Sequence, residues 1–177
     1  MSNQTDKIIA DYKTLSDTVE NLRTEGKKIV VTIGSWDLLH IGHVRYLLEA
    51  KKHGDIVVVG VDTDRAIKLY KGSLRPVVPE KERMEMLSYQ SCVDFITGVD
   101  DLDDDGAWQY NLISLIKPDV FVAVEDSYPK KQQGEISQHC DKLVVLPRQA
   151  ENTSTSNMIQ DTLKKHLSEM MDLLNKR

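Results

Sequence analysis

Residues 28–48 (KIVVTIGSWDLLHIGHVRYLL) constrain the fold more than any other part of the chain. Residues 28–33 form a β-branched run bounded by Gly26 and Gly34, which is typical of a strand buried on both faces of a parallel sheet. Apolar residues then recur at helical spacing from Val44, so a helix is expected to begin just before it. A buried strand, a short turn and a helix in this order indicate an α/β fold.

Two histidines, His40 and His43, are expected in the first turn of that helix. The unpaired backbone N–H groups and the positive dipole end of a helix N-terminus attract phosphate. Gly42 lies between the histidines and would leave room for a ligand to approach the backbone. Zinc is a weaker interpretation, because helical zinc ligands are spaced i, i+4 and no other Cys or His cluster supplies further ligands, so no metal-binding residues are predicted. An ordinary surface or capping role for the histidines stays open.

The rest of the chain alternates between strand and helix patterns. Further strands are predicted over residues 55–61, 93–97, 119–124 and 142–146, and helices over residues 8–22, from 79, over 107–116 and from about 156. Residues 71–79 have the Gly and Pro content of a mobile surface loop. The pattern predicts one domain of the α/β class, with a Rossmann-like, doubly wound, five-stranded parallel sheet. Residues 1–26 would form an N-terminal helix packed on the domain, and residues 27–177 the domain with its C-terminal helix.

Composition limits the class of partner. The chain has 40% hydrophobic and 29% charged residues, and its apolar runs are of strand length, so no membrane segment is expected. The N-terminus lacks the pattern of a secretory signal, and the two cysteines form no C-x-x-C motif, which together favour a cytoplasmic location. A net charge of −5 argues against nucleic-acid binding. Apolar stripes on the first and last helices favour a homodimer.

Two more stretches suited to phosphate should reach the carboxyl ends of the strands. One carries Lys71 and Arg75 in a loop and Arg83 on the following helix. The other carries Arg148 and the hydroxyl residues 154–156 at the start of the last helix. Each could instead be a solvated charge or a simple helix cap. The three stretches converge on one edge of the sheet, which favours a site for a phosphorylated ligand.

Three motifs resemble one known family. GSWDLLHIGH resembles the H-x-G-H signature of the nucleotidyltransferase superfamily, in the cytidylyltransferase-like branch. KGSLRPVVPEKER is similar to the heptose-type K-G-x-x-R-P-V-x-P-x-x-x-R, and STSNMI is similar to S-T-[ST]-x-x-I. The resemblance covers residues 26–159. Within the branch it is to the adenylyltransferase domain of ADP-heptose synthase first, and to glycerol-3-phosphate cytidylyltransferase next.

The resemblance implies roles for particular residues. The implied catalytic residues are His40, His43, Lys71 and Arg83. The implied nucleotide-binding residues are Ile33, Gly34, Ser35, Gly42, Arg148, Ser154, Thr155 and Ser156. The weaker candidates for binding the acceptor are Asp37, Asp62, Arg75, Glu125 and Asp126. Asp37 and Asp62 could equally lie on the magnesium side or cap turns.

The reaction that the resemblance implies joins an NTP and a phosphorylated small molecule, with release of pyrophosphate. ATP and a heptose-type sugar 1-phosphate are the first expectation, with Mg²⁺ required to neutralise the triphosphate. The alternatives are a CTP-dependent enzyme acting on glycerol 3-phosphate or a related alcohol phosphate, and a non-catalytic nucleotide sensor. The chain departs from the heptose pattern N-G-C-F-D at residues 33–37 and from G-G-D-Y at residues 124–128, which leaves the acceptor open.

Overall fold

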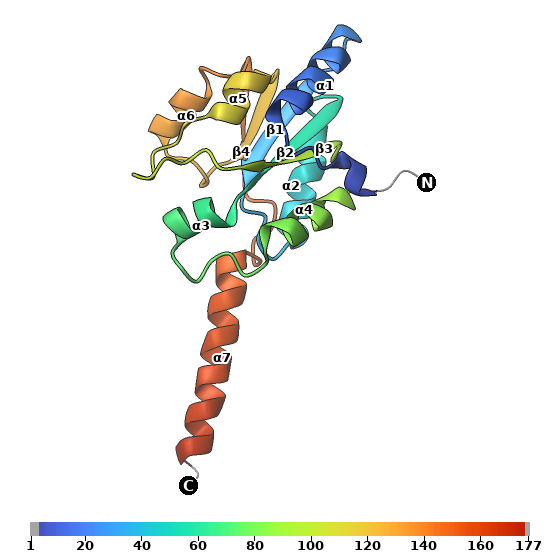
Figure 1. Ribbon diagram of the computed structural model, residues 1–177. Helices are drawn as coiled ribbons and strands as arrows, with labels where there is room; N and C mark the ends of the chain where they lie inside the picture. The colour runs from blue at the N-terminus through green and yellow to red at the C-terminus, as the bar shows by residue number, and fades with distance from the viewer. Residues whose placement is uncertain (1–3, 176–177) are drawn as a thin grey trace.

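Five parallel strands form the centre of the molecule in the computed structural model, which describes residues 4–175 (Figure 1). The strands are β1 (Ile29–Gly34), β2 (Ile56–Asp62), β3 (Phe95–Val99), β4 (Val120–Val124) and β5 (Lys142–Leu146). Their order is β3-β2-β1-β4-β5, and every neighbouring pair is parallel. The direction of winding reverses between β1 and β4, where such sheets bind ligands at their carboxyl ends.

Helices cover both faces of the sheet, which confirms the predicted Rossmann-like, doubly wound fold. α2 (Ile41–Lys51) and α4 (Glu80–Ser88) pack on one face through Tyr46, Leu47, Ala50 and Leu87. α1 (Tyr12–Thr24), α5 (Asn111–Ile116) and α6 (Lys130–Ile136) pack on the other through Leu15, Val19, Leu112, Ile113, Ile116 and Ile136. Because each face is covered, most strand positions need to be apolar, as in β1 and β2, where only Thr32, Gly34, Gly60 and Asp62 interrupt the aliphatic runs.

Two of the remaining helices, α3 and α7, lie at the carboxyl edge of the sheet or beyond it. α3 (Asp64–Lys71) follows β2 directly, and α7 (Thr155–Asn175) projects away from the sheet and its covering helices (Figure 1). A short 3-10 helix, η1 (Gln4–Lys7), precedes α1. None of the helices within residues 4–175 has both the length and the apolar composition to cross a membrane. Residues 1–3 and 176–177, at the outer ends of the predicted segments 1–26 and 27–177, lie outside the described residues.

Two predicted helices are shorter than their apolar patterns indicated. The first begins at Tyr12 rather than at Ile8, because Asp11 caps it by accepting a hydrogen bond from Thr14 N at 2.7 Å. Ile8 instead bridges to Ile96 of β3.

The helix predicted over residues 107–116 covers only Asn111–Ile116. Trp108 pairs with Leu102 in an isolated bridge, and Gln109 N donates to Asp101 O at 2.8 Å. Tyr110, which precedes the helix, has a left-handed backbone with φ 56°.

Candidate active site

The turn after β1 has an unusual backbone. Trp36 and Leu38 have φ values of 51° and 48°, in the left-handed region that residues other than glycine rarely adopt. The Trp36 indole is 5% exposed, and its Nε1 donates to Gly60 O of β2 at 2.9 Å. A Cβ at Gly60 would approach side-chain atoms of Ile33 and Val99 to 2.8 Å, so glycine allows the close packing beneath this turn. The buried indole anchors the turn that leads to His40.

His40 and His43 form a stacked pair at the start of α2. Their ring centroids are 3.9 Å apart, and His40 is the N-cap residue of the helix. Nδ1 of His40 accepts a hydrogen bond from Gly42 N at 3.1 Å, and Nδ1 of His43 accepts one from His40 N at 3.4 Å. Because each Nδ1 accepts, the proton of each neutral ring is on Nε2. Both imidazoles therefore have an Nε2–H group available as a donor.

Burial keeps both imidazoles neutral. It lowers the pKa of His40, and it also lowers the pKa of His43 to about 3, because His40 and Lys71 nearby further disfavour a positive charge on the His43 ring. At neutral pH the two rings are thus uncharged hydrogen-bond donors.

Gly42 provides space for protein atoms rather than for a ligand. A Cβ at this position would lie 2.9 Å from the His40 ring and 3.1 Å from Ala150 Cβ. Gly42 is also buried. The expected ligand approach at Gly42 is corrected accordingly: the glycine lets the His40 ring fold back over the helix N-terminus.

Asp37 joins three segments of the chain. Its carboxylate has no exposed surface and accepts hydrogen bonds from Arg75 Nε at 2.8 Å and from the backbone N–H groups of Val77 and Val78 at 2.9–3.1 Å. Its backbone oxygen accepts a hydrogen bond from Thr155 Oγ1 at 2.7 Å. Burial raises the pKa of Asp37, but the backbone donors and Arg75 outweigh it and leave the pKa below its usual value.

This arrangement corrects two expectations. The carboxylate of Asp37 is occupied by protein donors, among them the backbone N–H groups of Val77 and Val78, so the structure fits the turn-capping alternative and not a free carboxylate facing the acceptor substrate or magnesium. Residues 75–78 were predicted to belong to a mobile loop, but Arg75 and Val78 hydrogen-bond to Asp37 in the turn that precedes the histidines.

Lys71 is the last residue of α3 and reaches the end of β1. Its Nζ donates to Ser35 Oγ at 2.8 Å. Burial, and then the charge of Arg75, lower the pKa of Lys71. A cationic side chain that is partly removed from water interacts strongly with any phosphate that enters beside Ser35.

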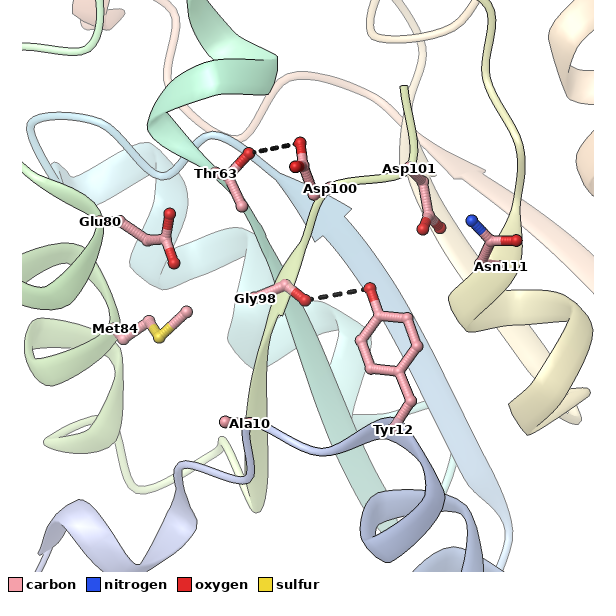
Figure 2. Close-up of a pocket in the computed structure, with 9 residues that line it drawn as sticks. All are labelled: Ala10, Tyr12, Thr63, Glu80, Met84, Gly98, Asp100, Asp101 and Asn111. Carbon is pink, nitrogen blue, oxygen red and sulfur yellow. Dashed lines mark hydrogen bonds between the residues drawn. The ribbon is translucent and has the colours of Figure 1, made fainter. Parts of the chain in front are cut away.

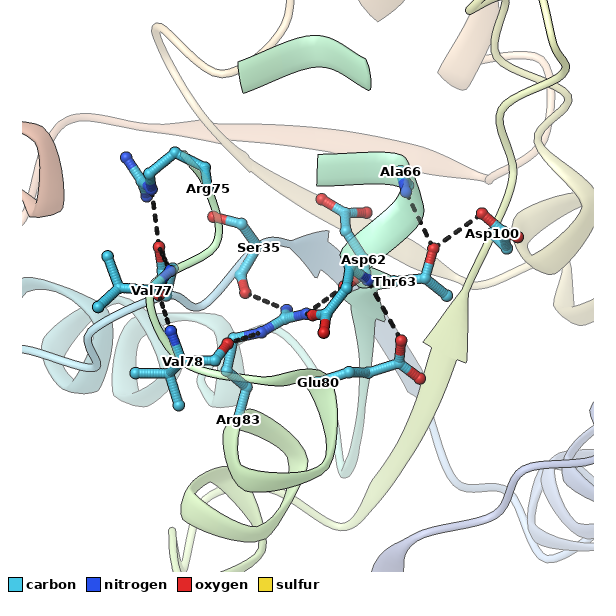
Figure 3. Close-up of polar contacts among 12 residues, drawn as sticks. Ser35, Asp62, Thr63, Ala66, Arg75, Val77, Val78, Glu80, Arg83 and Asp100 are labelled. Carbon is cyan, nitrogen blue, oxygen red and sulfur yellow. Dashed lines mark hydrogen bonds and ion pairs between the residues drawn. The ribbon is translucent and has the colours of Figure 1, made fainter. Parts of the chain in front are cut away.

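Arg83 is buried among the chain segments around Ser35, Asp62 and Val78 (Figure 3). Its side chain has no exposed surface, and its nitrogens donate to the backbone oxygens of Val78, Ser35 and Asp62 at 2.5–3.0 Å and to the Asp64 carboxylate at 2.7 Å. This placement corrects the expected contact between Arg83 and the substrates. Arg83 holds together the ends of β1 and β2 and the start of α4.

Asp62 is buried at the carboxyl end of β2. Tyr70 OH donates to its Oδ2 at 2.5 Å, whereas its Oδ1 is buried without a hydrogen-bond partner. Burial raises the pKa of Asp62 to about 6, although Tyr70, Lys71 and Arg83 each act to lower it. Asp62 therefore retains its charge near neutral pH at the expense of folding stability.

We expect Asp62 to make stability fall with rising pH. Its pKa is about 6 in the folded protein and about 3.9 in an unfolded chain. The stabilising effect is complete below pH about 4 and is lost as pH rises through 6, a change of about 3 kcal/mol. The free energy of unfolding should be measured with urea at several pH values across this range. It should fall with pH more steeply for wild type than for Asp62→Asn, because the amide does not titrate. Parallel curves would contradict this account of Asp62.

Arg148, Glu125 and Asp126 meet where β4 and β5 end. Arg148 Nε donates to Asp126 Oδ2 at 2.6 Å, and Arg148 N donates to Glu125 Oε1 at 3.3 Å. The Arg148 and Asp126 side chains remain about half exposed. A guanidinium that is paired but accessible can exchange its carboxylate for a phosphate.

The start of α7 lies at the same edge of the sheet. Ser154 caps the helix, since its Oγ accepts a hydrogen bond from Asn157 N at 3.1 Å. Thr155 donates to Asp37 O, and Ser156 is exposed. The helix begins one residue before the predicted position.

The predicted residues thus gather in two groups. Asp37, Lys71, Arg75 and Thr155 adjoin the turn before the histidines, while Glu125, Asp126 and Arg148 lie across the end of β4. Ile33 links β1 to the segment that follows β4, because its backbone oxygen accepts a hydrogen bond from Tyr128 OH at 3.1 Å. Sequence reasoning missed Tyr70, Asp64 and Tyr128. Only Tyr70 had a local signal, its position next to Lys71.

A cavity of about 410 Å³ lies beside β3 (Figure 2). None of the predicted site residues lines it. Its acidic side chains bond to the protein: Glu80 accepts from Asp64 N, Asp100 from Thr63 and Arg65, and Asp101 from Leu112 N. A cavity with this charge does not suit a triphosphate.

Comparison with known proteins identifies the family. The family model described as Cytidylyltransferase-like matches residues 31–168. The chain belongs to this family, and its class is that of the nucleotidyltransferases, as predicted.

Its relatives are longer proteins. The bifunctional protein HldE of Desulfatibacillum aliphaticivorans is 37% identical over 150 residues, which cover 83% of this chain and 29% of that protein. The bifunctional protein HldE of Helicobacter pylori is 38% identical over 164 residues, covering 93% and 33%. The chain spans about a third of the length of these curated relatives. The predicted resemblance is confirmed.

One solved structure is similar over nearly its whole length. The lipopolysaccharide core biosynthesis protein from Thermoplasma volcanium aligns with a TM-score of 0.57 and 28% identity, covering 70% of this chain and 98% of that one.

Proposed function

We propose that the chain transfers the adenylyl group of ATP to a heptose-type sugar 1-phosphate and releases pyrophosphate. An oxygen of the acceptor phosphate attacks the α-phosphorus of ATP, and the bond from that phosphorus to the oxygen shared with the β-phosphate breaks. One observation carries the proposal: two stacked, neutral histidines present Nε2–H donors at the carboxyl end of β1, close to Lys71. The similarity to relatives named bifunctional protein HldE supports the choice of reaction.

His40 and His43 would donate to oxygens of the α-phosphate and of the departing pyrophosphate. Their donors are fixed by the backbone hydrogen bonds to Nδ1, so little reorganisation accompanies the reaction. Lys71 would add positive charge at the same phosphates. Arg83 and Asp37 would act as positioning residues, because the polar groups of both side chains already bond other groups of the protein.

The start of α7 and Arg148 would hold the β- and γ-phosphates. Free N–H groups and hydroxyls at a helix N-terminus suit these oxygens. Gly34 ends β1 and Ser35 follows it, two residues before Asp37, whose backbone oxygen accepts a hydrogen bond from Thr155 at this helix start. The backbone of Gly34 and Ser35 would approach the nucleotide there.

We propose that Mg²⁺ enters bound to the triphosphate, as part of the substrate. Within residues 4–175, no group of three or more His, Cys, Asp and Glu side chains is arranged to hold a metal ion. The ion would then be coordinated mainly by phosphate oxygens and water, which are the ligands that Mg²⁺ usually takes with nucleotide substrates.

The acceptor would bind beside Arg75 and Asp62. Arg75 Nη2 is buried without a hydrogen-bond partner, so it has a donor left for an anionic oxygen. A CTP-dependent reaction with glycerol 3-phosphate is the second candidate, favoured by Leu146–Arg148, whose LPR sequence resembles the cytidylyltransferases.

A screen of pyrophosphate release separates these candidates. Each of four NTPs would be combined with heptose 1-phosphate, hexose 1-phosphates and glycerol 3-phosphate. We expect ATP with the heptose 1-phosphate to react fastest. Turnover confined to CTP and glycerol 3-phosphate would establish the second candidate instead.

Lys71→Ala distinguishes an enzyme from a nucleotide sensor. Charge beside the reacting phosphorus is most valuable in the transition state, so the variant should lower kcat at least about tenfold and raise the Kd for ATP much less. Lys68→Ala, an exposed position on the same helix, serves as the control and should match wild type. Steady-state kinetics and calorimetry on one preparation give both numbers. A variant that loses ATP binding but turns over normally at saturation would assign Lys71 to binding alone.

We expect Ser154 to contribute to folding stability and Ser156 to contribute to ATP binding. Ser154→Ala removes a helix cap and should lower the free energy of unfolding by about 1 kcal/mol. Ser156→Ala should leave stability unchanged and weaken ATP binding, because its exposed hydroxyl is free to bond a phosphate. Urea denaturation and calorimetry measure the two effects. Unaltered ATP affinity in Ser156→Ala would remove this hydroxyl from the triphosphate site.

A further inference from the structure

We propose that the cavity beside β3 binds a small aliphatic diamine, with one ammonium group bonded to Glu80 and the other to Asp101. The cavity measures about 410 Å³, a volume typical of pockets that hold small molecules. The proposal does not depend on the reaction proposed above, because none of the residues assigned to that reaction lines the cavity.

The cavity extends around the free edge of the sheet, where β3 is the outermost strand. Glu80 and Met84 line it from α4, on one face of the sheet, and Tyr12 and Asp101 line it from the side of α1 and α5 (Figure 2). Gly98 of β3 lies between the two sides. A Cβ at Gly98 would lie 3.0 Å from Met84 Cε and 3.3 Å from Glu80 Oε1, so any side chain there would narrow the passage. Because this residue is glycine, one elongated ligand can contact both sides.

The two carboxylates that would bind the diamine each have an oxygen to spare. Asp101 is only 3% exposed, yet within the described chain its side chain accepts one hydrogen bond, at Oδ2 from Leu112 N at 3.1 Å. The Glu80 carboxylate likewise accepts one, at Oε2 from Asp64 N at 3.3 Å. Neither carboxylate forms an ion pair within residues 4–175. A buried carboxylate without a cationic partner destabilises the fold, so a cation that enters the cavity gains a strong contact.

The electrostatic field in the cavity is negative. Burial raises the pKa of Asp101, and the charge of Asp100 raises it further. Burial also raises the pKa of Tyr12, and the charges of Asp101 and Asp100 again add to the effect. Asp100 is paired with Arg65 at 3.0 Å, but this arginine is not among the residues that line the cavity. A cation in the cavity would offset the repulsion between the carboxylates.

The lining favours a primary diamine over other cations. No group of three or more His, Cys, Asp and Glu side chains in the described chain is arranged to hold a metal ion. A quaternary ammonium ion is recognised by several aromatic rings, whereas Tyr12 is the one aromatic residue that the structure places at this cavity. A primary ammonium group has three N–H donors, which suit carboxylate oxygens. Met84 and Ala10 add apolar surface for the methylene groups between two such ends.

Calorimetric titration of the full chain with matched amines tests the site. Putrescine or cadaverine should bind at least about tenfold more tightly than butylamine, because only the diamines reach both carboxylates. Butanediol, which has the same chain length as putrescine but no charge, should give no heat of binding. The proposal would be overturned if neither diamine bound, or if butylamine or butanediol bound as well as the diamines. Stoichiometric binding of Mg²⁺ that excludes the diamine would overturn it too.

Two amide variants test the contacts. Glu80→Gln and Asp101→Asn can still accept hydrogen bonds from Asp64 N and Leu112 N, so both should fold, as circular dichroism would verify. Each should weaken diamine binding at least about tenfold and leave the diamine no tighter than butylamine, because one ammonium group loses its carboxylate. Asp105→Asn removes the same charge from an exposed position outside the cavity and should bind diamine as wild type does.

Equal losses in all three variants would reduce the effect to attraction by an acidic surface and refute the site. So would an amide variant that folds and keeps the wild-type preference for diamine. If Asp101→Asn fails to fold, Glu80→Gln alone decides the question, since Glu80 is only partly buried at the start of α4.

Discussion

His43→Ala is expected to lower kcat by about a hundredfold or more, with little change in the Kd for ATP. His43 is held by its stack with His40, by the bond from His40 N to Nδ1, and by the Trp36 ring, whose centroid is 5.5 Å away. Its Nε2–H is therefore fixed before substrate binds. A donor fixed in this way stabilises charge that develops on phosphate oxygens during the reaction more than charge already present in bound ATP.

Kinetics at saturating substrates and calorimetry with ATP test this expectation together. His53→Ala, two residues after the end of α2, provides a histidine control that should retain wild-type kcat. Because the pKa of His43 is about 3, its protonation should not shape kcat between pH 6 and 8. An unchanged kcat in His43→Ala would exclude the histidine from the chemistry, and a kcat that falls with a histidine-like pKa near 6.5 would contradict the neutral pair.

Arg83→Met is expected to lower the free energy of unfolding by about 3–5 kcal/mol, the largest stability effect anticipated for a single substitution. The side chain is fully buried and bonds three backbone oxygens and the Asp64 carboxylate. Removing the guanidinium leaves those acceptors without donors, and each buried, unpaired group weakens the folded state.

Chemical denaturation of Arg83→Met, followed by circular dichroism, gives the measurement. Arg45→Met removes an arginine that is exposed on α2, and its unfolding curve should overlay that of wild type. If Arg83→Met unfolds at the wild-type denaturant concentration but loses substrate affinity, Arg83 contacts substrate and the positioning role is wrong.

The fold could be predicted because its signals are local. The β-branched runs at the positions of β1, β2 and β4 read as buried strands, and the strand at residues 142–146 was predicted with its final bounds. The histidine turn was also apparent, since the motif GSWDLLHIGH combines the strand end, the turn and the helix start.

The roles of Asp37 and Arg83 could not be predicted, because their partners are distant in sequence. Asp37 bonds residues about 40 positions later, and Arg83 reaches back 48 positions to Ser35. Nothing near Asp37 in the sequence indicates those donors, and an arginine on a charged helix normally reads as exposed. The late start of α5 could not be predicted for a related reason: the apolar pattern of residues 107–116 gives no sign that Tyr110 adopts a left-handed backbone.

The central claim is that this site joins the α-phosphate of a nucleoside triphosphate to a phosphorylated acceptor. The most direct measurement follows ATP labelled at the α-phosphorus, with heptose 1-phosphate and Mg²⁺, through one turnover on the enzyme. The label should appear in a nucleotide-sugar product, with unlabelled pyrophosphate released in equal amount, and His43→Ala should slow this step. Label recovered in ADP would indicate transfer of the γ-phosphate instead, and bound ATP that stays intact with every acceptor would contradict the claim.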